Sequence, residues 1–501
     1  MKRMKRLIMG LIMLTTTAMT AGQSKQYGLR WEIGNSNDLG ERCYDAIGMS
    51  ATIGVGSTNG SSDFDSVYPW SEMKRCNIKL NENGAYNVTY EGEAGFALDG
   101  TNGDVFVRVP KFYYKRYRKD GYEYRVISES GSKVHPAFIE NGKELDEIFI
   151  SAFEGYKGSD DKLHSYGGVL PTCNLTAQTY LDLAQANGGN YSLYDMRCVD
   201  AVWNLMCIEY GCRNTNRFIG YGIADYVQPV NLYSYLLIAV AATNTNTVRT
   251  NKWTPSQKGL MPVGSNMTIC DTYQQNILTQ AKITACVDSG DYTDWTFDGK
   301  PIDVTPNCFV GSAACNTNFC ESVPSGALSW HTGRAAWITG KAATTRNPIR
   351  YRWIENVCGN LWHYLPDVSF NALQMYVCNN MKDYVMHKIT PPYLPVSTVF
   401  PENRSNGKKA DVVGANYWIT DLDYDPSAIG VSFGRSYDLN LTCDKAFGSY
   451  YYLSSNNVMI ANGGGFDHLW RCNVLTLRAW ITPDRKWYLY GARLMFKNLS
   501  H

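Results

Sequence analysis

The sequence predicts an α+β fold, in which a small antiparallel sheet, two helices and long loops follow a β-rich N-terminal module. Three observations support this prediction. Short apolar runs alternate with turn-forming clusters before residue 100, two stretches of helical period lie between residues 176 and 210, and extended segments follow from Ile349. With 501 residues, 44% of them apolar, the chain is long enough for two or three domains.

The first 22 residues resemble a secretory signal peptide. Four basic residues fall within the first six, and an apolar run from Leu7 to Leu14 precedes a run of small residues. A second interpretation is that translation starts at Met19, which leaves only a short tail before Tyr27. No later segment holds 18 consecutive apolar residues, so we expect no membrane span.

Residues 23–100 are predicted to form the β-rich N-terminal module. Clusters of Gly, Asn, Ser and Asp at 34–37, 56–60 and 81–84 mark turns between short apolar runs. Two helices are expected further along. Thr176 can cap the first, which Gly188-Gly189 ends, and the second runs from Asp195 to Tyr210 before Gly211.

Residues 212–345 are rich in Asn, Thr and Gly without a clear period, and are predicted to be a loop-rich insertion. Beyond it, Gly359 and Asn360 suit a tight turn with positive φ. Trp353 and Trp362 can then fill the core beneath the sheet.

The composition argues against some classes of function and leaves others open. Lys plus Arg is 47 and Asp plus Glu is 46, a net charge of +1, which argues against nucleic acid as a partner. Tyr outnumbers Phe by 35 to 17, which suits a wet recognition surface and equally suits a β-rich fold with many edge tyrosines. The 15 cysteines form no paired C-x-x-C motif, so most are expected to be buried as small apolar residues, and disulfides remain open if the protein is exported.

No enzyme motif emerges. The seven histidines show no H-x-x-x-H or H-E-x-x-H spacing, and Asp421-x-Asp423-x-Asp425 lacks the rest of a calcium loop. Glu144-x-x-Glu147 could form a carboxylate pair, but a surface position is favoured. The sequence therefore predicts no catalytic residue, no cofactor and no metal site.

The last forty residues contain two glycine-rich anchors. Gly463-Gly464-Gly465 lets the backbone bend into a terminal hairpin, and Gly491 permits a close approach before Arg493 returns to the core. Between these anchors the segment from Phe466 to Trp480 mixes acidic, basic and aromatic side chains without a period.

Three features follow one another along the chain: two helices, then Ile354-Glu355-Asn356-Val357-Cys358-Gly359-Asn360-Leu361-Trp362, and then a terminal Gly-Gly…Gly-Ala-Arg-Leu segment. This order resembles the C-type-lectin fold of phage tail proteins and of variable proteins diversified by retroelements. The resemblance implies that residues 101–501 form one C-type-lectin-like domain, with the insertion at about 212–345 and a variable-type terminal segment at 463–494. It also implies a rigid frame made by Trp353, Gly359, Asn360, Trp362, Gly464, Gly491 and Arg493.

By the same resemblance, the protein is expected to be a non-catalytic receptor-binding protein with a diversifiable surface, associated with a phage tail, secreted or on a cell surface. Its partner would be a protein or glycan receptor, and relatives suggest a homotrimer. The candidate ligand-binding residues are Phe466, Asp467, His468, Arg471, Asn473, Leu475, Leu477, Arg478, Tyr488 and Tyr490. Two alternatives are a lectin-fold enzyme of the formylglycine-generating type, which would use Cys443 and Cys472, and a structural tail or adhesin component.

Overall fold

The computed structural model describes residues 24–52, 60–81, 85–219, 236–258, 263–264, 266–272, 276–312, 349–371, 374–396, 402–403, 416–424, 432–438, 447, 449–453, 458–465 and 472–499. The predicted signal segment 1–22 lies outside these ranges. None of the helices in the described part of the chain is long and apolar enough to cross a membrane.

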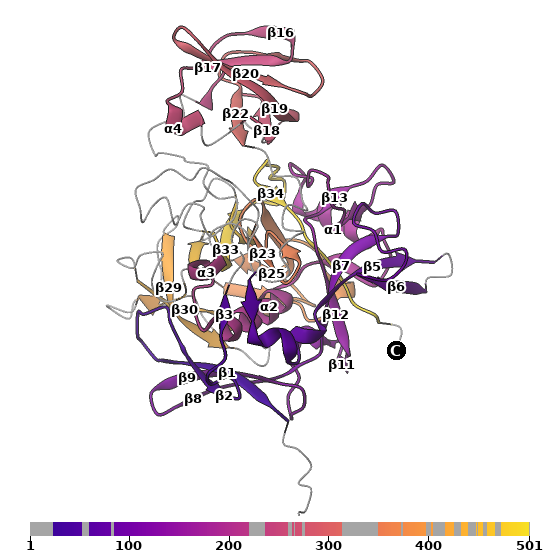
Figure 1. Cartoon of the computed structure of the whole chain (residues 1–501), viewed down its shortest axis with the longest axis vertical. Helices are drawn as coiled ribbons and strands as arrows, with labels where there is room; N and C mark the ends of the chain where they lie inside the picture. The colour runs from indigo at the N-terminus through magenta and orange to yellow at the C-terminus, as the bar shows by residue number, and fades with distance from the viewer. Residues whose placement is uncertain are drawn as a thin grey trace, which may run out of the picture.

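The described structure is β-rich, and the predicted α+β, C-type-lectin-like fold with one small sheet is wrong. Only two helices exceed four residues, whereas the strands form sheets of four, five, six and ten strands (Figure 1). The error arose after residue 212, where segments without a clear period were taken as loops. Strand β25 (Trp362–Asn371), which follows the predicted insertion, has nine of its ten residues buried, so it has no polar face to alternate with an apolar one.

Two sheets join the N-terminal module to later residues. The four-stranded sheet, in the order β2-β1-β9-β8, consists of β1 (Gln26–Glu32), β2 (Glu41–Tyr44), β8 (Tyr113–Lys119) and β9 (Tyr122–Ser128). The six-stranded sheet, in the order β15-β35-β12-β7-β5-β6, consists of β5 (Lys74–Leu80), β6 (Tyr86–Tyr90), β7 (Asp104–Pro110), β12 (Glu147–Ser151), β15 (Tyr191–Leu193) and β35 (Leu494–Phe496). Both sheets pair strands from before residue 100 with strands from after it, so the predicted module boundary at 100 does not separate them.

The two long helices lie where the sequence predicts them. Helix α1 (Ala177–Gln185) begins after Thr176, whose side chain accepts a hydrogen bond from the Thr179 amide. Helix α2 (Met196–Tyr210) is capped by Asp195 and ends at Gly211, which adopts a left-handed conformation with φ 67°. Every residue of α2 is buried, so this helix forms the centre of the core.

The described part of the predicted insertion is a β-module rather than loops. Its five-stranded sheet, in the order β17-β20-β19-β18-β22, lies at the top of Figure 1 and consists of β17 (Thr247–Asn251), β18 (Asn266–Cys270), β19 (Ile277–Ser289), β20 (Tyr292–Phe297) and β22 (Phe309–Ser312). Strands β16 (Ala242–Thr245) and β21 (Ile302–Val304) pair beside it. The module meets the body where Phe309 packs against Tyr488, with ring centroids 5.5 Å apart.

The C-terminal third forms the ten-stranded sheet. Its strands are β25, β26 (Gln374–Val377), β27 (Leu394–Pro395), β28 (Glu402–Asn403), β29 (Asn416–Tyr424), β30 (Ser432–Asp438), β31 (Tyr450–Leu453), β32 (Val458–Gly463), β33 (Asn473–Ile481) and β34 (Tyr490–Gly491). Strand β33 is central, because it pairs with β32 on one side and β31 on the other.

The remaining elements are short. They are the paired strands β3 (Ala51–Thr52) and β4 (Ser61–Ser62), β10 (Ile139–Glu140) and β11 (Lys143–Glu144), β13 (Tyr156–Lys157) and β14 (Leu163–His164), β23 (Arg350–Tyr351) and β24 (Ile354–Glu355); the helices α3 (Asn216–Ile219) and α4 (Pro255–Lys258); and the 3₁₀ turns η1 (Asp63–Ser66), η2 (Trp70–Glu72), η3 (Pro136–Phe138) and η5 (Met381–Asp383).

Candidate functional site

Six of the ten candidate ligand-binding residues are buried. The exposed fraction is 5% for Arg478 and 2% or less for the others, which are Asn473, Leu475, Leu477, Tyr488 and Tyr490. Side chains this deeply buried cannot contact a partner, so these six do not form an accessible surface. The other four, Phe466, Asp467, His468 and Arg471, lie outside the described residues, in the segment that joins β32 to β33.

The buried polar residues of β33 are bound within the fold. The Asn473 side chain accepts hydrogen bonds from Ser449 Oγ at 3.1 Å and from the Leu475 amide at 3.3 Å, and donates to Asn214 Oδ1 at 3.1 Å. The Arg478 guanidinium lies 5.4–5.7 Å from the ring centroids of Trp362, Trp487 and Tyr490. Residues 472–479 are all buried, so both faces of β33 are covered, which explains why these polar residues are not on the surface.

Most of the predicted frame residues occupy the positions expected of them. Gly359 and Asn360 have φ values of 80° and 57°, and Trp362 is fully buried. Trp353 differs, because it is only half-buried and lies with φ 68° in the turn between β23 and β24. The prediction that Trp353 fills the core is therefore corrected: its side chain lies at the core's edge.

The terminal glycines and Arg493 also fit the frame. Gly464 has φ 88°, and a Cβ on Gly491 would lie 2.6 Å from Leu361 Cδ1. Arg493 is buried, and its guanidinium donates to the Ser151 carbonyl at 2.7 Å and to the Asn356 carbonyl at 3.1 Å. These bonds tie the last strands to the middle of the chain.

A buried carboxylate organises the same frame. Glu154 accepts a hydrogen bond from the Asn356 amide at 2.8 Å and one from Asn360, and it lies 2.9 Å from His363 Nε2. Burial lowers the pKa of His363 from its ordinary value, although Glu154 acts against this shift. The neutral imidazole and the two amides are therefore structural partners of Glu154, enclosed in the core.

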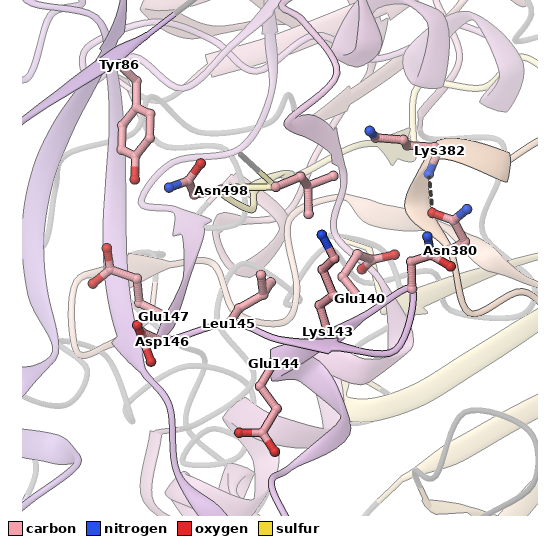
Figure 2. A pocket seen from close by; sticks show the side chains of 12 residues that line it. Tyr86, Glu140, Lys143, Glu144, Leu145, Asp146, Glu147, Asn380, Lys382 and Asn498 are labelled. Atoms are coloured by element: carbon pink, nitrogen blue, oxygen red, sulfur yellow. Dashed lines mark hydrogen bonds between the residues drawn. The ribbon is translucent and has the colours of Figure 1, made fainter. Parts of the chain in front are cut away.

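The structure contains a polar pocket elsewhere, with a volume of about 280 Å³. It forms where the β10–β11 hairpin, the η5 turn and the residues after β35 meet beside β6. Figure 2 shows Tyr86 and Asn498 on one side, Asn380 and Lys382 on the other, and Lys143 between them. The polar part of the lining is completed by Glu140, Asn141, Glu144, Asp146 and Glu147, and its apolar members are Leu145 and Leu499.

The hairpin beside the pocket follows from two residues of the sequence. Asn141 and Gly142 have φ values of 50° and 74°, and Glu140 pairs with Lys143 across them. A two-residue turn with positive φ at both positions is the arrangement that Asn-Gly favours. This turn brings Lys143 to the pocket.

Below the pocket, Glu140 is held in a buried ion cluster with Asp195, Arg197 and Lys497. Glu140 Oε2 lies 2.9 Å from Lys497 Nζ and 3.0 Å from Arg197 Nη2, and Oε1 accepts a hydrogen bond from the Met381 amide at 2.6 Å. Burial alone would raise the pKa of Glu140, but Lys497 and Arg197 outweigh it and lower that pKa. Asp195 Oδ2 also binds Lys497, at 3.1 Å. The cluster thus fastens the hairpin to helix α2, the η5 turn and the terminal segment.

The acidic residues around the pocket are engaged by cations. Lys111 Nζ lies 2.9 Å from Asp146 and 3.7 Å from Glu144, and Glu147 pairs with Arg108. Among the described residues that line the pocket, none is a histidine or a cysteine. The negative charges of the lining are thus balanced in part by Lys111 and Arg108.

Tyr86 is the aromatic member of the lining. Its hydroxyl hydrogen-bonds to the side chain of Asn498, and its ring packs edge-on against Phe496 with centroids 4.9 Å apart. Burial raises the pKa of Tyr86, with a further contribution from Glu147, so the phenol stays neutral. It therefore contributes an uncharged hydroxyl to the lining.

The enzyme alternative gains no support from the described residues. Cys472 is fully buried and donates through Sγ to the Gly465 carbonyl at 3.2 Å, while Cys443 lies outside the described ranges. Eleven of the twelve described free cysteines are buried, as predicted, and Cys286 is half-buried. In the described ranges, no group of three or more His, Cys, Asp and Glu is arranged to hold a metal ion.

No protein-family model matches the chain, and no similar curated protein is found. The sequence indicates Glu144 and Glu147 as a possible carboxylate pair with a surface position favoured, but it does not predict the pocket that they line. The Asn141-Gly142 dipeptide was the available signal for the hairpin. Nothing in the sequence indicated that residues near 86, 382 and 498 would meet it.

Proposed function

We propose that the protein is a non-catalytic binding protein that recognises a hydroxyl-rich ligand, a glycan of a target surface, in the pocket beside the β10–β11 hairpin. The observation that carries this proposal is the mixed lining. Sugar hydroxyl groups both donate and accept hydrogen bonds, and the pocket offers amides at Asn380 and Asn498, a phenol at Tyr86 and ammonium groups at Lys143 and Lys382.

The buried ion cluster supports the proposal because it makes the pocket rigid. Glu140 is bonded to Lys497, Arg197 and the Met381 amide, so each of the three segments that form the pocket is fixed to a common floor. A site that is already ordered loses less conformational entropy on binding. A volume of about 280 Å³ suits one or two sugar units and implies modest affinity for a single site.

Several copies acting together would compensate for modest affinity. Presenting the site on a homotrimer, on a phage tail or on a cell surface would raise avidity by about two to four powers of ten. These assembly and location assignments are part of the proposal. The ligand would then be a repeated glycan of the surface to which the particle or cell adheres.

The experiment is binding of the full chain to an array of immobilised glycans. The Lys143→Gln and Asn498→Ala variants should lose most of the signal on the glycans that the unchanged protein binds. Lys79→Gln, which removes an exposed charge on β5, is the matched control and should bind normally. Thermal unfolding of each variant checks that the fold is intact.

Variants of the terminal segment provide a contrasting test of where the ligand binds. Of the predicted contact residues, only Phe466, Asp467, His468 and Arg471 remain candidates for a diversified surface. Replacing Phe466, His468 and Arg471 together by Ala should leave glycan binding unchanged if the pocket is the site. Loss of binding in this triple variant, with normal binding in the pocket variants, would overturn the proposal.

A further inference from the structure

The four-stranded sheet has one face that is not used by the core. Along β1, Tyr27, Leu29 and Trp31 are buried, whereas Arg30 between them points the other way and is partly exposed. The same alternation along β8 leaves Lys115 and Lys119 exposed on either side of Tyr117. We call the outward side chains Arg30, Lys115, Tyr117, Lys119 and Tyr124 the tyrosine–lysine face.

A continuous row of side chains crosses this face. The register places Glu41 opposite Arg30, Arg30 opposite Tyr124, and Tyr124 opposite Tyr117. Arg30 lies 2.8 Å from Glu41 Oε2 and donates to the Tyr124 hydroxyl at 3.1 Å. The row is therefore pre-ordered by its own contacts rather than by a ligand.

The orientation of the two rings determines what the face can offer. Tyr117 and Tyr124 are stacked with centroids 4.5 Å apart and an interplanar angle of 8°. Because neighbouring strands are about 4.8 Å apart, two parallel rings on them must turn their faces toward each other. The Tyr117 hydroxyl is hydrogen-bonded to the Tyr44 hydroxyl and the Tyr124 hydroxyl accepts a bond from Arg30, and each keeps capacity for a further hydrogen bond. The faces that the two rings turn toward each other are closed to stacking by nucleic-acid bases.

The net charge on the face is positive, because Arg30, Lys115 and Lys119 outnumber the carboxylates of Glu32 and Glu41. Glu41 is engaged by Arg30, and Lys115 and Lys119 are exposed about 13 Å apart along β8, since each residue of a strand advances by about 3.3 Å. Two ammonium groups at this spacing, with tyrosine hydroxyls between them, complement a chain that carries repeated negative charges. The chain's own basic start, with Lys2, Arg3, Lys5 and Arg6, has the same sign of charge and does not complement it.

The size of the face favours a linear partner. Three strands of seven residues and one of four cover roughly 400 Å² from strand spacing and rise, about half of the ~800 Å² that one partner buries in a standard protein interface. We propose that the tyrosine–lysine face binds an anionic polysaccharide, whose carboxylate or sulfate groups pair with Lys115 and Lys119 while its hydroxyls bond to Tyr117. This site is separate from the pocket and does not depend on the proposed function.

The test compares three polymers on the full chain by affinity electrophoresis: polygalacturonate, dextran sulfate and neutral dextran. We expect retardation by at least one anionic polymer and none by neutral dextran, with retardation weakened by added salt. The two anionic arms distinguish carboxylate from sulfate recognition.

The Lys115→Gln/Lys119→Gln variant should bind the retained polymer about ten-fold more weakly or worse, a change of ~1.4 kcal/mol or more. Lys79→Gln/Lys300→Gln removes the same charge from other exposed positions and should bind like the unchanged protein. Tyr117→Phe should show an intermediate loss, and the pocket variant Asn498→Ala should show none.

Equal weakening in the two double variants would overturn the inference, because it would show a dependence on net charge alone. The inference would also be overturned if neutral dextran retarded the protein as strongly as the anionic polymers do. Absence of retardation by all three polymers would overturn it as well. Displacement of the polymer by single-stranded DNA of lower charge would indicate a base-binding surface instead and would contradict the argument from ring orientation.

Discussion

In the central strand β33, Asn473 and Arg478 are buried and bonded or packed within the fold, whereas in the β10–β11 hairpin Asn141 and Lys143 are exposed and border a pocket. The residue types are nearly the same. What differs is the position of the strand: β33 has a neighbour on each side, while the hairpin lies at the margin of the body. Side-chain chemistry alone therefore does not distinguish an internal polar group from one that can meet a ligand.

Breaking the buried ion cluster should give the largest effect, because Lys497 ties the hairpin to the start of helix α2. Lys497 is fully buried against Glu140 and Asp195, so Lys497→Met leaves two carboxylates with one cation fewer. We expect the free energy of unfolding to fall by ~3–5 kcal/mol in denaturant titration. The surface control Lys79→Met should change it by less than ~0.5 kcal/mol. A loss below ~1 kcal/mol in Lys497→Met would mean that the cluster does not hold the hairpin.

Adding a side-chain carbon at Gly491 tests how closely the terminal segment packs against Leu361. A Cβ there would lie 2.6 Å from Leu361 Cδ1 and 3.2 Å from Leu361 Cβ, and Leu361 is fully buried and cannot move aside. Gly491→Ala should therefore cost ~1–3 kcal/mol of unfolding free energy. Gly189→Ala, where nothing lies within 4 Å of the added carbon, is the matched control and should be nearly neutral. Equal stability of the two variants would contradict the packing described for β34.

His164 is intermediate between a buried and an exposed polar residue, because its side chain is almost buried and yet contacts the exposed Asp160. Its Nδ1 lies 3.2 Å from Asp104 Oδ1 and its Nε2 3.0 Å from Asp160 Oδ1. Burial acts to lower the pKa of His164, but hydrogen bonds and charge from Asp104 and Asp160 raise it overall. Stabilisation by the imidazolium is thus complete below the unfolded-state pKa and is lost as pH rises through the higher folded-state pKa.

Unfolding free energies measured across this pH window should fall with increasing pH in the unchanged protein. The slope should be smaller in His164→Gln, which cannot titrate. If both proteins gave the same slope, the two aspartates would not be stabilising a charged His164.

Local signals in the sequence were sufficient for local structure. Thr176 and Asp195 mark the starts of α1 and α2, and Gly211 and Gly359 adopt the positive φ values expected of them. Each of these outcomes depends on a few neighbouring residues, so the sequence contains the information needed.

The fold class and the site depend on partners that are distant in the chain. Arg478 is buried because rings from residues 362, 487 and 490 surround it, and the pocket unites Tyr86 with Lys382 and Asn498. Strand β25 lacks alternation because both its faces are covered. Such features arise only when the sheets assemble, and no local pattern encodes them.

The strand order β15-β35-β12 has a consequence for how the protein is made. Residues 494–496 insert between two strands that are synthesised more than 290 positions earlier, so the facing edges of β12 and β15 stay without their partner during translation. Unpaired edges of this kind readily join a second nascent chain. We therefore expect slow elongation near the end of the message to favour intermolecular association, and chaperones that shield extended segments to improve the yield.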